Sequence, residues 1–185
     1  MACSAVAVGR ALPCKDSLGG IKQIWISPWA ISGVPIDWAA VTAGEIANIT
    51  TSTAVVFKNY DMHKNTGSFT QTVNASVENG TIFYTQVVSC VFSNEVAADI
   101  SNFQDLTKGR LAICVQDVND NVFVMGHTRG VELTGGTLES GVAMGDFNGL
   151  KYEFTAEEFI AAPFLTMTTP AVPTGDMVTF TPTAS

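Results

Sequence analysis

The segment 68–92 constrains the fold of this chain more than any other stretch. It reads SFTQTVNASVENGTIFYTQVVSCVF, and its central Asn79-Gly80 is the dipeptide that a type I′ turn prefers, because both turn residues need a positive φ. Alternating polar and apolar residues flank that turn on both sides. The pattern predicts a β-hairpin with strands of about ten residues, roughly twice the usual length. A two-residue turn would pair Phe69 with Cys90.

The two faces of this hairpin differ in chemistry, because opposite residues of a hairpin share a face. We expect one face to lie on the core of its own subunit, and its apolar side chains are Phe69, Val73, Val77, Ile82, Tyr84 and Val88. The other face is polar and rich in hydroxyl groups, with Thr70, Thr72, Asn74, Ser76, Glu78, Thr81 and Thr85. A ribbon this long projects beyond a compact domain unless something covers it, and we expect identical neighbours to do so.

The composition narrows the class of protein. A chain of 185 residues is long enough for one domain with a substantial core. Charged residues make up 14% of it, against about 25% in ordinary soluble domains. Low charge and many hydroxyl groups suit a surface buried in an assembly, and also an ordinary β-rich extracellular domain. The net charge of −8 argues against a protein that holds nucleic acid by its phosphates.

Targeting signals are not visible. No run of the sequence has the length of a membrane-spanning helix, and the start MACSAVAVGR lacks the charged region of a signal peptide. We therefore expect synthesis in the cytoplasm and no membrane partner.

The rest of the chain reads as short strands with a single helix. Strands are expected at 21–27, 54–60, 110–117, 122–127, 131–134 and 150–155, with an edge strand at 177–181. Gly135-Gly136 should interrupt the strand pattern, 156–162 should form a short helical turn, and Pro163 should open the tail.

The helix is predicted over 93–106. Ser93 or Asn94 should cap it. Its apolar stripe consists of Val96, Ile100, Phe103 and Leu106, which helical spacing places on one face.

These elements predict a mainly β fold in a single domain over residues 1–185. The expected architecture is a β-sandwich or open barrel with one flanking α-helix. Residues 1–13 and 166–185 are expected to be extended N- and C-terminal arms that dock on a partner.

Catalytic, cofactor and metal sites are not expected, so the chain is not predicted to be an enzyme. His63 and His127 have no partners at the spacing that a metal site or a general base requires. Asp117 begins an Asx-rich turn. Glu157 and Glu158 are adjacent and should simply solvate a surface.

The cysteines do not form a metal-binding or redox motif. We expect four free thiols at Cys3, Cys14, Cys90 and Cys114, although the first two could pair. Cys90 and Cys114 fall inside expected strands and should be small core residues.

Two stretches carry a resemblance to a known family. The first, 9–26, reads GRALPCKDSLGGIKQIWI. The second lies within 124–158 and includes MGHTRGVELTGGTLESGVAMGDFNGLKYEFTAEE, with Met144-Gly145-Asp146 and Asn148-Gly149 as its best part. Together they resemble the tail tube (major tail) proteins of tailed bacteriophages.

The resemblance implies a specific assembly. It implies hexameric rings stacked into a tube, long hairpins lining the bore, arms contacting the next ring, and passage of DNA through the bore. The polar hairpin residues would then face the lumen, the partners would be further copies and other tail proteins, and the location would be the virion tail.

The sequence also fits two other classes of protein. One is another virion part on a similar fold, such as a tail terminator, a hub or a head-decoration protein. The other is an extracellular carbohydrate-binding β-sandwich, which predicts exposed aromatic side chains on one face, with Trp25, Trp29 and Trp38 as candidates.

Overall fold

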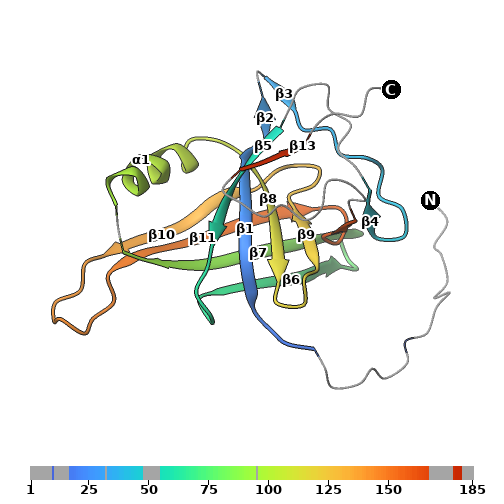
Figure 1. Cartoon of the computed structure of the whole chain (residues 1–185). Helices are drawn as coiled ribbons and strands as arrows, with labels where there is room; N and C mark the ends of the chain where they lie inside the picture. Colours follow the sequence, from blue (N-terminus) through green and yellow to red (C-terminus); the bar gives the residue numbers. More distant parts are fainter. Residues whose placement is uncertain are drawn as a thin grey trace.

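Two β-sheets and one helix make up the described part of the chain (Figure 1). The structure is a computed structural model that describes residues 10, 17–31, 33–47, 55–94, 96–166 and 177–180. The first sheet has the spatial order β13 (Met177–Phe180), β5 (Val55–Asp61), β1 (Ile21–Pro28), β8 (Leu111–Asp117), β9 (Val122–Met125), β12 (Phe164–Leu165) and β4 (Glu45–Ile46).

The second sheet has four strands and carries the long hairpin. Its order is β10 (Glu132–Glu139), β11 (Gly149–Glu158), β7 (Thr81–Ser93) and β6 (Gly67–Ser76). β2 (Ala30–Ile31) and β3 (Val34–Pro35) pair as a small two-stranded ribbon. The helix is α1 (Ala97–Leu106).

The main core lies between the two sheets. Ile24 and Ile113 from the large sheet join Val88 and Phe154 from the four-stranded sheet in one cluster, and all four side chains are fully buried. This contact makes the fold a sandwich with no closed barrel. The prediction of a mainly β, single-domain sandwich with one helix is therefore confirmed.

A second core covers the other face of the large sheet. Trp25 and Cys114 point to this side, and Trp38 packs edge-on against Phe57 with ring centroids 6.2 Å apart. The large sheet is therefore buried on both faces. That explains why β8 is buried at six of its seven residues.

The long hairpin is present, but its register differs from the prediction. Phe69 pairs with Val88 instead of Cys90, because a four-residue turn over 77–80 replaces the two-residue turn. In this turn Ser76 Oγ accepts a hydrogen bond from Asn79 N at 3.3 Å, and Gly80 supplies the positive φ of 62°. A shift of two residues keeps every side chain of the paired strands on its predicted face, whereas a shift of one would have exchanged the faces.

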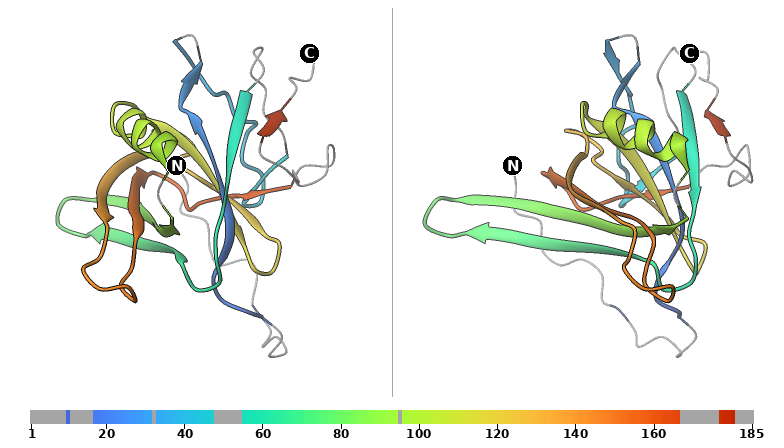
Figure 2. Two further views of the ribbon diagram at one scale, coloured as in Figure 1. Left: turned by 60° about the vertical axis from the view of Figure 1, so that its left-hand side comes forward. Right: turned by 90° about the vertical axis from the view of Figure 1, so that its left-hand side faces the viewer.

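The hairpin projects beyond the domain, as its length predicted (Figure 2). On its core-facing side, Val88 is buried and Phe69 and Tyr84 are partly buried. Val73 and Ile82 lie past the end of the core and are exposed, with 54% and 57% of their surface accessible. Val77 is in the turn rather than in a strand, so the prediction that it lies on the core of its own subunit is wrong.

The helix begins later than predicted. Ser93 still belongs to β7, where it pairs with Gly149, so neither it nor Asn94 caps the helix. Val96 is the N-cap residue, and its backbone N donates a hydrogen bond to Asp99 Oδ2 at 3.0 Å.

The predicted apolar stripe of the helix is buried only at its C-terminal half. Leu106 is buried, and the Phe103 ring stacks on Tyr152 with centroids 5.6 Å apart. Val96 and Ile100 are exposed.

Three expectations for the C-terminal half are also wrong. Gly135 and Gly136 lie inside β10, where a bulge follows Leu133, instead of interrupting a strand. The expected helical turn over 156–162 begins as strand, because β11 continues to Glu158. Beyond Pro163, β12 pairs with β9 and β4.

Both predicted arms lie largely outside the described residues. Residues 1–9 and 11–13 are outside, as are 167–176 and 181–185. The predicted edge strand is confirmed over Met177–Phe180, where β13 pairs antiparallel with β5 at one edge of the large sheet.

Candidate functional site: the outer face of the four-stranded sheet

The outer face of the four-stranded sheet gathers the polar residues of the hairpin. Pairing places Thr72 opposite Thr85 and Ser76 opposite Thr81 on this side. Asn74 Nδ2 donates a hydrogen bond to Thr85 Oγ1 across the strands at 2.7 Å. Six of the seven residues predicted to face a lumen therefore share one surface, and these are Thr70, Thr72, Asn74, Ser76, Thr81 and Thr85. The seventh, Glu78, lies in the exposed turn.

Strand β11 adds acidic residues that the hairpin lacks. Glu157 is the register partner of Thr85, and Glu153 is the register partner of Ser89. Partners in a β-ladder share a face, so both carboxylates lie beside the hydroxyl groups of the hairpin, and both are exposed. The sequence could not show this, because the pairing joins segments about 70 residues apart.

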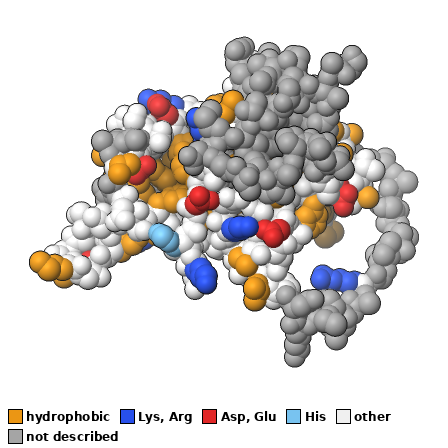
Figure 3. Space-filling model, viewed as in Figure 1, with side chains coloured by type: hydrophobic (Ala, Val, Ile, Leu, Met, Phe, Trp, Pro, Cys, Tyr) orange, Lys and Arg blue, Asp and Glu red, His pale blue; other side chains and the backbone are white. Residues whose placement is uncertain are grey.

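Basic side chains on this face are offset by carboxylates. Lys151 Nζ lies 2.8 Å from Glu139 Oε1, and hydrogen bonding to Lys151 is the main cause that lowers the pKa of the Glu139 carboxyl. Charged side chains of both signs are scattered over the side of the molecule shown in Figure 3. A surface of this kind should bind a phosphate backbone weakly, because strong binding needs clustered Lys and Arg.

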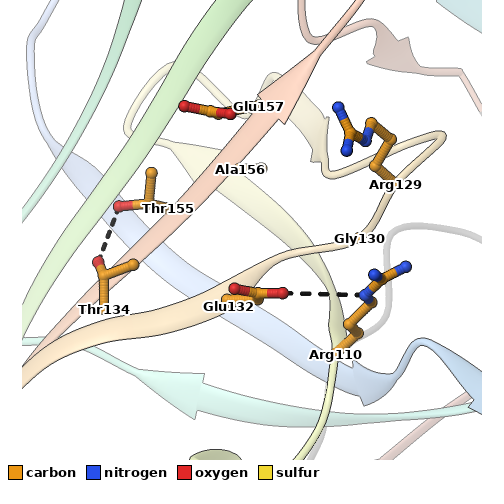
Figure 4. Close-up of a pocket in the computed structure, with 8 residues that line it drawn as sticks. All are labelled: Arg110, Arg129, Gly130, Glu132, Thr134, Thr155, Ala156 and Glu157. Carbon is orange, nitrogen blue, oxygen red and sulfur yellow. Dashed lines mark hydrogen bonds and ion pairs between the residues drawn. The ribbon is translucent and has the colours of Figure 1, made fainter.

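A hollow of about 310 Å³ lies at the margin of this face (Figure 4). Arg110 and Arg129 flank it, and Glu132 and Glu157 project into the same region. Arg110 Nε is 3.8 Å from Glu132 Oε1, and the Arg129 guanidinium lies 5.8 Å from the centre of the Phe159 ring. Both cations therefore already have partners within the chain.

Glu158 does not solvate a surface, contrary to the prediction. Only 1% of its surface is exposed, and its Oε1 accepts hydrogen bonds from the backbone N of Thr128 at 2.9 Å and of Arg129 at 2.7 Å. Burial lowers the pKa of the neighbouring His127 imidazole, and the charge of Glu158 acts in the opposite direction. The carboxylate thus holds the loop between β9 and β10 in place. No local signal in the sequence identified it.

The cysteines in the described residues are core residues, as predicted. Cys90 and Cys114 are free and buried, and burial raises the pKa of each thiol to about 12. Thiols of this kind are not nucleophiles at neutral pH. Cys3 and Cys14 lie outside the described residues.

The described residues contain neither a metal-binding cluster nor a membrane-spanning helix. Among the described residues, no group of three or more His, Cys, Asp and Glu side chains is placed to hold a metal ion. No helix in the described segments is long and apolar enough to cross a bilayer.

The tryptophans do not form the exposed aromatic face that a sugar-binding site would need. Trp25 and Trp38 are buried in the second core, with 2% and 7% of their surface exposed. Trp29 is half-buried and packs against Gly130, at which an added Cβ would lie 3.2 Å from the indole ring. The prediction that these side chains form one exposed face is wrong for Trp25 and Trp38.

Comparison with known proteins gives no relative. No protein family, no curated protein and no solved structure matches the chain.

Proposed function

We propose that the chain is the tail tube subunit of a tailed bacteriophage, a virion structural protein whose stacked rings form a conduit for DNA. The observation that carries the proposal is the four-stranded sheet, whose edge strands β10 and β6 each pair with only one strand among the described residues, and whose outer face is polar and acidic. The large sheet and the helix lie on its inner side and would form the outside of the ring.

The two edges of this sheet are complementary in direction. Strands β10, β11, β7 and β6 are antiparallel to one another in turn, so the edge strands β10 and β6 also run in opposite directions. A neighbouring copy can therefore place its β6 beside β10 of the first and continue the antiparallel ladder. Repetition closes a ring and removes two long edges, which would otherwise invite aggregation.

The size of such a ring is compatible with a conduit. Six copies of four strands, spaced ~4.8 Å apart and tilted by ~40°, give a circumference of about 150 Å and a backbone diameter of about 48 Å. The hydroxyl groups and carboxylates of the outer face would line the bore. A lining without a basic cluster lets DNA slide, because phosphates are not held by the release of counterions.

Electron microscopy tests the proposal directly. The purified chain, concentrated and in crowded solution, should form rings or hollow tubes in negative stain. A protein that remains a small single particle under all these conditions would overturn the proposal. Rings that never stack would instead favour a terminator, hub or decoration protein of the virion.

A further inference from the structure

Two connections lie at opposite ends of the four-stranded sheet. The loop 140–148 joins β10 to β11 at the end where Gly149 pairs with Ser93. The hairpin turn 77–80 lies at the other end, beyond the pair Ser76 and Thr81. The 13 residues of β7 between them span about 43 Å, and Figure 1 and the right-hand view of Figure 2 show the two connections well apart.

Each of these ends displays aliphatic side chains to solvent. At the loop, Val142 and Met144 have 102% and 109% of their reference surface exposed, and we call these two residues the loop patch. At the hairpin end, Val77 is 99% exposed and lies near the half-exposed Val73 and Ile82, and we call these three the tip patch. Orange side chains stand out at the far left of Figure 3, where the loop lies in Figure 1. Groups of exposed apolar residues mark interaction sites.

The loop that carries the loop patch is held by internal hydrogen bonds. Asp146 Oδ2 accepts hydrogen bonds from the backbone N of Val142 at 2.9 Å and of Ala143 at 2.8 Å, and Asp146 N donates to Ala143 O at 3.1 Å. At its base, Lys151 Nζ lies 5.0 Å from the centre of the Phe147 ring. These contacts fix the backbone that carries two exposed aliphatic side chains. A preorganised surface of this kind loses little entropy when it binds.

We propose that the tip patch of one copy docks on the loop patch of a second copy in the next ring. The inference rests on the proposed tube, in which strands tilted by ~40° run from one rim of a ring to the other. The two patches then lie on opposite rims, and each copy contributes one of each. Their separation excludes contact within one chain. A contact between two different surfaces repeats without closing and so produces an open stack.

Crosslinking tests the pairing itself. The test chain carries Val77→Cys and Met144→Cys, with Cys3 and Cys14 replaced by Ser, while Cys90 and Cys114 remain because both are buried. A short bismaleimide applied to assembled tubes should give a ladder of covalent dimers, trimers and longer chains. Each single-cysteine variant should give no ladder beyond dimers. Tubes that form normally but yield no ladder would overturn the inference and leave the proposed function intact.

Charged substitutions test the contribution of the contact to stacking. Val77→Asp, and separately Val142→Asp with Met144→Asp, should weaken ring-on-ring association by at least about tenfold per contact, because an aliphatic contact becomes a buried charge. Single rings should persist in these variants. Ile100→Asp, at an exposed position of α1, is the matched control and should leave the tube length unchanged.

The outcomes separate the two proposals. Tubes of normal length in both Asp variants would overturn the pairing. Loss of rings in Val77→Asp would also overturn it, because the tip would then contact a neighbour within the ring. If the unmodified chain forms neither rings nor tubes, the proposed function fails first.

Discussion

Glu158 is the single residue whose role differs most from its appearance in the sequence. Its carboxylate accepts two backbone hydrogen bonds from the loop after β9. Glu158→Ala should therefore lower the free energy of unfolding by about 1–3 kcal/mol, because two N–H groups at a part-buried site lose a charged acceptor. Urea denaturation measures the change. The neighbouring Glu157→Ala is the control, since an exposed side chain should contribute within about 0.5 kcal/mol. Equal effects of the two substitutions would refute this account of Glu158.

Asp146 should make the loop patch sensitive to acid. Hydrogen bonds from the backbone of Ala143 and Val142 lower the pKa of its carboxyl. The loop contacts are thus fully formed above the ordinary carboxyl pKa of about 3.9 and are lost as the pH falls through the lower folded value. In an NMR titration, the amide protons of Val142 and Ala143 should shift together with a midpoint below about 3.9. Asp146→Asn should abolish that titration, and a midpoint above the ordinary value would contradict the geometry.

At the scale of elements, α1 depends on a position without a side chain in β10. A Cβ at Gly136 would lie 2.7 Å from Phe103 Cε2, the ring that stacks on Tyr152. Gly136→Ala should push this ring away and destabilise the fold by about 1–3 kcal/mol. Thermal unfolding measures the loss. Gly135→Ala is the matched control, because its Cβ would make an ordinary contact with Glu153 at 3.4 Å, and a larger effect there would refute the argument.

The hairpin shows which features of an element its sequence can predict. Alternation predicted the two faces, with Phe83 and Val87 as apolar exceptions on the polar face, and both faces hold along the paired strands because alternation has a period of two. The turn type was not predictable from Asn79-Gly80 alone. The Ser76 hydroxyl favours a four-residue turn by accepting the Asn79 N–H, and it moves the pairing by two residues. The predicted start of the helix was wrong for a similar reason, because pairing with Gly149 keeps Ser93 in the sheet.

At the scale of the whole molecule, the candidate site was only half visible in the sequence. The hydroxyl-rich hairpin face is local and was predicted residue by residue. The carboxylates of Glu153 and Glu157 join that face only through pairing of β11 with β7, which no local pattern specifies. Burial of Trp25 and Trp38 likewise depends on the segment that folds over the outer side of the large sheet.

If the polar face lines the bore, cations placed on that face should hold DNA inside the assembled tube. Thr72→Lys with Thr85→Lys places two cations side by side on that face, because the two residues are register partners. Tubes assembled from this variant with short duplex DNA should retain nuclease-protected DNA at low salt and release it as the salt rises, since clustered cations bind phosphates through counterion release.

The control adds the same charge elsewhere. Asn102→Lys with Gln104→Lys places two cations at exposed positions of α1, on the side of the molecule away from the proposed bore. DNA bound there would remain open to nuclease. Protection by the sheet variant alone would place the hydroxyl-rich face inside the tube. Equal protection by both variants, or protection by the helix variant alone, would place that face elsewhere and remove the main physical argument for a DNA conduit.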